Sequence, residues 1–207
     1  MIAIVDYGVG NLFSLKSSFT AIGQEVTVTG DAQVLRQADK LILPGVGAFE
    51  DAAAKLRATG LDKVIQEEAA KGKPILGICL GMQLLFEKSF EFGEHQGLGL
   101  IPGSVIPMAG FIPDELKIPH IGWNALRIRR ESPLFRLIGQ GDCVYFVHSY
   151  FASQCDSSVI ADTEYGRYLT AAVQHGNVYG CQFHPEKSGN VGLNILKAFA
   201  QLEDAPC

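Results

Sequence analysis

The residues best suited to chemistry in this sequence are a glycine-flanked cysteine and a histidine far along the chain. Cys79 lies in Gly77-Ile-Cys-Leu-Gly81, between a short apolar run and a helix-like run. A nucleophile at such a strand-to-helix turn is exposed, and flanking glycines relieve the crowding there. The free N–H groups at the helix start would favour the thiolate. The segment predicts a nucleophilic cysteine, although a tight turn with a small apolar side chain fits the same pattern.

A cysteine nucleophile needs a base, and His184 is the best candidate. It lies in Gln182-Phe-His-Pro-Glu186, directly after an expected strand. In an extended backbone, residues two apart point to the same side, so Glu186 could orient the imidazole. A His-Pro-Glu tripeptide alone also fits a surface turn. Ligands of open α/β sheets collect at the carboxyl ends of strands, so both motifs together favour catalysis.

The first half of the sequence alternates apolar strands with amphipathic helices. Asn11 is a possible N-cap of the first helix. The expected strands are 2–6, 25–29, 39–43 and 74–78, and the expected helices are 11–22, 51–57, 61–71 and 80–87. Such alternation predicts a parallel sheet with helices on both faces.

The second half reads mostly as strands and ends in a helix at 191–202. The expected strands are 125–129, 143–151, 159–162, 169–174 and 178–183. They would extend the sheet with antiparallel strands. We expect an α/β, doubly wound, flavodoxin-like fold with a mostly parallel central sheet. Because no linker or repeat is visible, residues 1–207 are expected to form one domain.

Composition and charge exclude several functions. The net charge is −5 without a basic tract, which argues against nucleic-acid binding. No apolar run reaches the roughly 18 residues of a membrane span, and the N-terminus predicts a strand rather than a signal peptide. The five cysteines contain no C-x-x-C pair, which argues against a zinc site or a disulfide framework and favours the cytoplasm. Cys143 and Cys181 are expected to be buried, inert thiols.

Several motifs resemble those of class I glutamine amidotransferases. The segment from Gly77 to Gln83 and the His184-Pro-Glu186 tripeptide carry this resemblance. Other segments are similar to one branch, the glutaminase subunits of imidazole glycerol phosphate synthase in histidine biosynthesis. These segments are Asp6-Tyr-Gly-Val-Gly-Asn11, Leu43-Pro-Gly-Val-Gly-Ala-Phe49, Pro119-His-Ile-Gly-Trp-Asn124, Val147-His-Ser-Tyr150 and His184-Pro-Glu-Lys-Ser-Gly189. The resemblance covers nearly the whole chain.

The resemblance implies that Cys79 attacks the side-chain amide of L-glutamine and forms a glutamyl thioester. It makes His184 the proton carrier and Glu186 its partner, without a cofactor or metal. The Leu80 N–H and the glycine-rich loop with Val46 and Gly47 are expected to stabilise the oxyanion. The other residues expected around the glutamine are Gln83, His148, Ser149 and Tyr150. Gln83 would also fit a solvent-facing helix position.

A partner is implied because the sequence contains no nucleotide-binding motif and no second domain to consume ammonia. The resemblance implies a heterodimer with a (β/α)8-barrel cyclase subunit. Asn11, Trp123 and Lys187 are candidates for the docking face, although Trp123 could instead belong to the core. Three alternatives stay open: a glutaminase subunit for another synthase such as anthranilate synthase, a non-catalytic interaction subunit, and a cysteine hydrolase that cleaves γ-glutamyl peptides.

Overall fold

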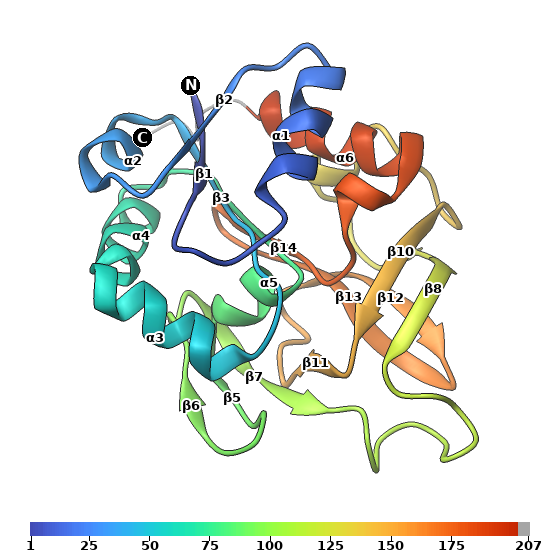
Figure 1. Ribbon diagram of the computed structural model, residues 1–207. Helices are drawn as coiled ribbons and strands as arrows, with labels where there is room; N and C mark the ends of the chain where they lie inside the picture. Colours follow the sequence, from blue (N-terminus) through green and yellow to red (C-terminus); the bar gives the residue numbers. More distant parts are fainter. Residues whose placement is uncertain (203–207) are drawn as a thin grey trace.

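A central eight-stranded sheet organises the computed structural model, which describes residues 1–202 (Figure 1). Five neighbouring strands are parallel, and three antiparallel strands extend the sheet at one side. In spatial order the strands are β2 (Val26–Thr29), β1 (Ile2–Val5), β3 (Lys40–Leu43), β4 (Ile75–Ile78), β14 (Val178–Cys181), β13 (Arg167–His175), β12 (Val159–Tyr165) and β9 (Arg127–Ile128). The predicted α/β fold, with a mostly parallel sheet and an antiparallel extension, is confirmed.

Helices cover both faces of this sheet, as the alternation of apolar runs predicts. The helices are α1 (Leu12–Ala21), α2 (Ala32–Gln37), α3 (Phe49–Thr59), α4 (Leu61–Ala70), α5 (Leu80–Leu84) and α6 (Gly189–Ala200). Buried side chains of α1 and α6 pack with Ile2 and Ile4 of β1, whereas those of α2, α3 and α4 pack with Ala3 and Val5. Successive β1 residues therefore face opposite layers, and Figure 1 shows the two helical layers on either side of the sheet.

Two smaller sheets lie beside the central one and were not predicted as separate sheets. One contains β11 (Tyr150–Ser153), β7 (Ile101–Pro107), β5 (Phe86–Ser89) and β6 (His95–Gln96), and the other pairs β10 (Cys143–His148) with β8 (His120–Ala125). The expected strand 143–151 is therefore interrupted at Ser149, where the chain passes from one small sheet to the other. Two short 3-10 helices, η1 (Pro133–Phe135) and η2 (Pro185–Lys187), complete the elements.

The prediction of a helix over 80–87 was wrong, because α5 ends at Leu84. The backbone carbonyls of Leu84, Leu85 and Phe86 accept hydrogen bonds from the segment 98–101 instead of continuing the helix. Tertiary pairing thus overrides the local preference. The short helix α2 was missed, and the strand expected at 125–129 divides into β8, which begins at His120, and β9.

No helix within residues 1–202 combines the length and the hydrophobicity that crossing a bilayer requires.

Candidate active site

Cys79 occupies the sharp turn between β4 and α5. Its φ of 55° places a non-glycine residue in the left-handed region, as a nucleophile elbow requires. The elbow packs tightly against β3: a Cβ on Gly81 would lie 1.8 Å from the Leu43 carbonyl oxygen. A Cβ on Gly77 would lie 2.7 Å from the Gly81 carbonyl oxygen. The two flanking glycines are therefore required by contacts that leave no room for a side chain.

His184 follows β14, which is the parallel neighbour of β4. The backbone N–H of Cys79 donates to the Cys181 carbonyl at 2.7 Å, so the pairing continues past the end of β4. The backbone N–H of His184 donates to the Tyr145 carbonyl at 3.0 Å, and the Ser188 hydroxyl donates to the His184 carbonyl at 2.6 Å. Cys79 and His184 therefore lie close together, at the carboxyl ends of two neighbouring strands of the sheet.

Glu186 lies against the imidazole of His184. The His184 Nδ1 atom is 2.8 Å from the Glu186 Oε1 atom, and both side chains are buried. The expectation of an extended backbone here was wrong, because Pro185–Lys187 form the 3-10 helix η2. His184 itself is extended, and the turn after it returns the carboxylate to the ring. Since a carboxylate only accepts, Nδ1 carries the hydrogen and Nε2 is left for the sulfur.

The environment of His184 favours its charged form. Burial alone lowers its pKa, but hydrogen bonds and attraction from Cys79 and Glu186 outweigh that penalty and raise the pKa to about 9. The imidazole is therefore protonated near neutral pH while it faces the sulfur. A sulfur nucleophile, a protonated imidazole and a carboxylate in this order can attack a carbonyl carbon and protonate a leaving amine.

A cavity of about 600 Å³ opens over Cys79 and His184. It brings together every residue that the sequence placed around a substrate. The lining residues are Val46, Gly47, Cys79, Leu80, Gln83, Glu91, Phe92, Pro119, Val147, His148, Ser149, Tyr150, His184 and Lys187. The cavity has the size and mixed polarity expected of a small-molecule site.

The start of α5 and the loop from Pro44 to Gly47 lie beside each other at this cavity. Leu80 is the first residue of α5, so its N–H has no partner within the helix. The loop from Pro44 to Gly47 lies across from it, and Gly47 has a φ of 94°. A Cβ on Gly45 would lie 2.7 Å from the Gly81 nitrogen, so the loop rests directly on the helix start. This arrangement can place amide groups around a developing oxyanion.

Gln83 and His148 hold the wall of the cavity in place. Gln83 is buried, contrary to the solvent-facing alternative, and its Nε2 donates to the Tyr150 carbonyl at 3.1 Å and to the Gln182 Oε1 at 3.0 Å. The His148 Nδ1 atom lies 2.8 Å from the same Tyr150 carbonyl. Burial lowers the pKa of His148 to about 3, so this ring is neutral near pH 7. His120 supports it from behind, with 3.2 Å between its Nδ1 and the His148 Nε2.

Sequence reasoning missed Glu91 and Phe92 in this cavity. The Glu91 Oε2 accepts a hydrogen bond of 2.6 Å from the backbone N–H of Phe49, the first residue of α3, whose N-cap offers no side-chain acceptor. The aromatic rings of Phe92 and Tyr150, which both line the cavity, meet edge to face with centroids 6.2 Å apart. Glu91 caps a helix that begins 42 residues earlier in the chain, and no local sequence pattern marks such a contact. It can therefore be found only from the fold.

The three expected docking residues lie in different settings. Lys187 lines the cavity, and its Nζ lies 5.9 Å from the centroid of the Tyr145 ring. Trp123 is 55% exposed, which rules out the core alternative. Asn11 caps α1 through its side chain and lines a small cavity behind His184 and Glu186. Asn11 and Trp123 do not line the larger cavity.

Three other cysteines lie within the described residues. Cys181 is buried, as expected, and burial raises its pKa. Cys155 is also buried, which raises its pKa to about 11. The expectation for Cys143 was wrong: it begins β10 with its side chain on the exposed side of the strand. Cys207 lies outside the described residues.

Comparisons with known proteins agree with this geometry. Residues 3–201 match the family "Glutamine amidotransferase class-I". The imidazole glycerol phosphate synthase subunit HisH of Oceanobacillus iheyensis is 50% identical over 203 residues, which cover 98% of this chain and 99% of that protein. The subunit of the same name from Lactococcus lactis is 52% identical over 201 residues, covering 97% and 98%.

Solved structures of lower identity share the fold. The structure of PurLQS from Thermotoga maritima superposes with a TM-score of 0.76 at 22% identity, covering 96% of each chain. A crystal structure described as a glutamine amidotransferase gives 0.75 at 19% identity, covering 96% of this chain and 98% of the other. With the family match over nearly its whole length, the chain belongs to the class I glutamine amidotransferases.

Proposed function

We propose that this chain is the glutaminase subunit of an imidazole glycerol phosphate synthase. The observation that carries the proposal is the meeting of Cys79 and His184 over one cavity, with Glu186 bound to the imidazole. Several enzymes use glutaminase subunits of this family. The choice of imidazole glycerol phosphate synthase is supported by relatives named HisH, which are about 50% identical to this chain over nearly their full length. The substrate is then glutamine, and the products are glutamate and ammonia.

The proposed reaction begins when the Cys79 sulfur attacks the side-chain amide carbon of glutamine. The new S–C bond places negative charge on the amide oxygen, which accepts from the Leu80 N–H and from the loop with Val46 and Gly47. His184, protonated near neutral pH, gives its proton to the amide nitrogen. The C–N bond then breaks, ammonia leaves, and a glutamyl thioester remains on Cys79.

Hydrolysis of the thioester uses the same groups in reverse. Because His184 has given its proton to the departing ammonia, the ring is neutral and can take a proton from water. The hydroxide adds to the thioester carbon, and the same backbone donors hold the oxyanion. When the C–S bond breaks, glutamate is released and the proton on His184 restores the starting pair. Glu186 orients the ring throughout.

The polar groups of the cavity fit the two ends of the substrate. Glu91 supplies a carboxylate for the α-ammonium group, and its Oε1 is not used in the bond to Phe49. Gln83, His148, Ser149 and Tyr150 form the wall against which the glutamine chain would lie. We assign them to binding rather than to proton transfer, because His148 is neutral near pH 7.

Ammonia needs a consumer, and we propose a (β/α)8-barrel cyclase subunit that forms a heterodimer with this chain. Free ammonia is protonated in water and then no longer reacts as a nucleophile. Trp123 and Lys187 are exposed and both lie beside the Tyr145 ring, which supports a docking face around β8, β10 and η2. Asn11 would belong to the same face.

The test measures glutamate release by this chain alone and with a cyclase subunit and its substrate. The wild-type complex should use glutamine, whereas Cys79→Ala should make product only from added ammonium. Cys155→Ala is the matched control, since it removes a buried thiol outside the cavity and should keep glutamine-dependent synthesis. Synthesis with an anthranilate-forming subunit but not with the cyclase would assign the chain to another synthase. Wild-type glutamate release by Cys79→Ala would refute the proposed nucleophile.

A further inference from the structure

Tyr7 is a buried tyrosine at the active-site edge that does not line the substrate cavity. It follows β1 by two residues, so it lies at the carboxyl edge of the sheet. Its hydroxyl donates a buried hydrogen bond of 2.8 Å to the Pro44 carbonyl. Pro44 is the residue before the Gly45-Val46-Gly47 segment, which carries one side of the proposed oxyanion site.

Contacts on both sides fix the orientation of the Pro44–Gly45 peptide. A Cβ on Gly10 would lie 3.1 Å from Pro44 side-chain atoms, so the chain after Tyr7 packs on the proline ring. A Cβ on Gly45 would lie 3.0 Å from the Tyr7 hydroxyl and 2.9 Å from the Leu80 Cβ. Because the peptide unit is planar, holding its carbonyl towards Tyr7 also fixes the direction of the Gly45 N–H. The loop thus begins in one defined orientation against the helix start.

We propose that Tyr7 is a positioning residue that holds the oxyanion-binding loop through the Pro44 carbonyl. The inference rests on the proposed glutaminase function, and it assigns to Tyr7 a role in transition-state stabilisation without contact with substrate. Glycines at 45 and 47 leave the loop many accessible conformations, since each lacks a Cβ. The hydrogen bond from the Tyr7 hydroxyl to the Pro44 carbonyl restricts this freedom at the start of the loop.

The hydroxyl remains a donor throughout the working pH range. Burial raises the pKa of Tyr7, and the nearby Cys79 raises it further, so the phenol stays protonated. The described contacts give the hydroxyl one acceptor, the Pro44 carbonyl. A phenylalanine at this position keeps the ring and its packing but leaves the carbonyl without its donor.

The test compares Tyr7→Phe with Tyr179→Phe. Tyr179 is also a buried tyrosine, but it lies on β14 and its ring packs against Phe199 of α6. Losing one oxyanion donor lowers kcat by roughly 100- to 1000-fold, and displacing it should cost less. We expect kcat for glutamate release to fall about 10- to 100-fold in Tyr7→Phe, with KM changed less than about twofold. Tyr179→Phe should match the wild type.

Alkylation of Cys79 by iodoacetamide separates positioning from effects on the sulfur. This reaction forms an S–C bond and expels iodide without creating an oxyanion, so its rate and pH profile should not change in Tyr7→Phe. Expressing kcat per alkylatable Cys79 corrects for any unfolded fraction. An unchanged kcat would overturn the inference, and so would alkylation that slows in parallel with kcat. Absence of glutamate release by the wild type, alone and with cyclase, would instead count against the proposed function.

Discussion

The backbone N–H of Cys79 donates to the carbonyl of Cys181 at 2.7 Å, which ties the proposed nucleophile to the strand that leads into His184. β4 and β14 are parallel and adjacent, with Ile78 opposite Cys181. Cys79 and His184 are far apart in sequence, but they follow two strands that pair directly with each other, so they lie close together in space. Pairing within the sheet thus sets the relative placement of Cys79 and His184.

Gly81→Ala tests how closely the elbow packs on β3. The new methyl group would lie 1.8 Å from the Leu43 carbonyl oxygen, so the strand and the elbow must separate. We expect the free energy of unfolding to fall by about 3 kcal/mol and glutamate release to be lost. Gly139→Ala is the matched control, since a Cβ there meets nothing within 4 Å. Urea denaturation measures the free energy of unfolding, and a turnover assay measures glutamate release. Equal stability of the two variants would contradict the close packing of Gly81 on Leu43.

Glu186→Gln tests the electrostatic support of His184. In the wild type the pKa of His184 is raised to about 9, so kcat/KM should decline as pH rises through about 9 and the imidazolium is lost. The Glu186 carboxylate contributes to that rise, and a neutral amide removes its attraction. The alkaline limb of kcat/KM should therefore move to lower pH. The measurement is kcat/KM for glutamate release as a function of pH. If the alkaline limb lies at the same pH in Glu186→Gln and in the wild type, Glu186 has a purely structural role.

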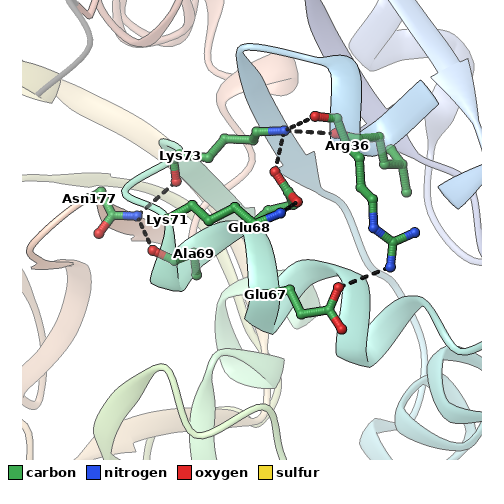
Figure 2. Close-up of polar contacts among 8 residues, drawn as sticks. Arg36, Glu67, Glu68, Ala69, Lys71, Lys73 and Asn177 are labelled. Carbon is green, nitrogen blue, oxygen red and sulfur yellow. Dashed lines mark hydrogen bonds and ion pairs between the residues drawn. The ribbon is translucent and has the colours of Figure 1, made fainter. Parts of the chain in front are cut away.

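A buried ion cluster at the opposite edge of the sheet allows stability to be changed without touching the site. The Glu68 carboxylate, 3% exposed, receives both Lys71 and Lys73 at 2.6 Å. Lys73 precedes β4, whereas Cys79 follows it. Lys73 also donates to α2, where the Leu35 and Arg36 carbonyls accept at 3.0 and 2.8 Å. Figure 2 shows this lysine between Glu68 and Arg36. The cluster therefore fastens α4 to α2.

Lys73→Met should destabilise the protein more than Lys71→Met. Lys73 is 10% exposed and Lys71 is 63% exposed, so only the first exchange removes a buried partner. At pH 7 we expect Lys73→Met to lower the free energy of unfolding by about 2 kcal/mol. Lys71→Met should lower it by less than about 0.5 kcal/mol. Turnover should not change in either variant. Equal losses in denaturant melts would contradict this assignment.

The pH dependence of that cluster has a defined sign. Burial raises the pKa of Glu68, but the hydrogen bonds from Lys71 and Lys73 outweigh it and the net pKa is lowered. The stabilisation is therefore present above the unfolded pKa of about 4.3 and is lost as pH falls through the folded value. The difference in the free energy of unfolding between the wild type and Lys73→Met should therefore become smaller below about pH 4.

Much of the fold followed from the sequence because its signals are local. Apolar runs that alternate with amphipathic helices predicted β1, α1, β3 and β4, and the Asn11 side chain caps α1 as expected, accepting from the Ser14 N–H at 3.3 Å. The end of α5 could not be predicted, since the carbonyls of 84–86 bond to a segment more than ten residues later. The two small sheets likewise depend on pairings between distant segments.

The candidate site divides in the same way. Cys79, His184 and Gln83 carry recognisable spacing, and the structure places all three at one cavity. Glu91 and Tyr7 carry none, because each acts through a backbone group about 40 residues away. Cys143 was misjudged because a strand alternates between its two faces, and apolar neighbours do not reveal which face is exposed.

Trp123→Ala tests the proposed docking face. The indole is 55% exposed, so its removal should leave the fold intact while it weakens binding to the cyclase. A central tryptophan of an interface contributes about 2 kcal/mol, or roughly 30-fold in Kd. Leu137→Ala is the control, since Leu137 is an exposed apolar residue that does not line the cavity. Titration calorimetry with the purified cyclase measures both, and equal Kd values for both variants would remove Trp123 from the interface.

Mapping a glutamine-shaped electrophile on the intact protein tests the central claim most directly. A diazoketone analogue of glutamine should label Cys79 rapidly, because that thiol lies in the cavity and faces His184. Excess glutamine should slow the labelling, and His184→Ala should nearly abolish it. Cys143 is the internal control, since it is exposed but does not line the cavity. Peptide mass mapping should find the label on Cys79 alone; equal labelling of Cys79 and Cys143, unaffected by glutamine, would contradict the account.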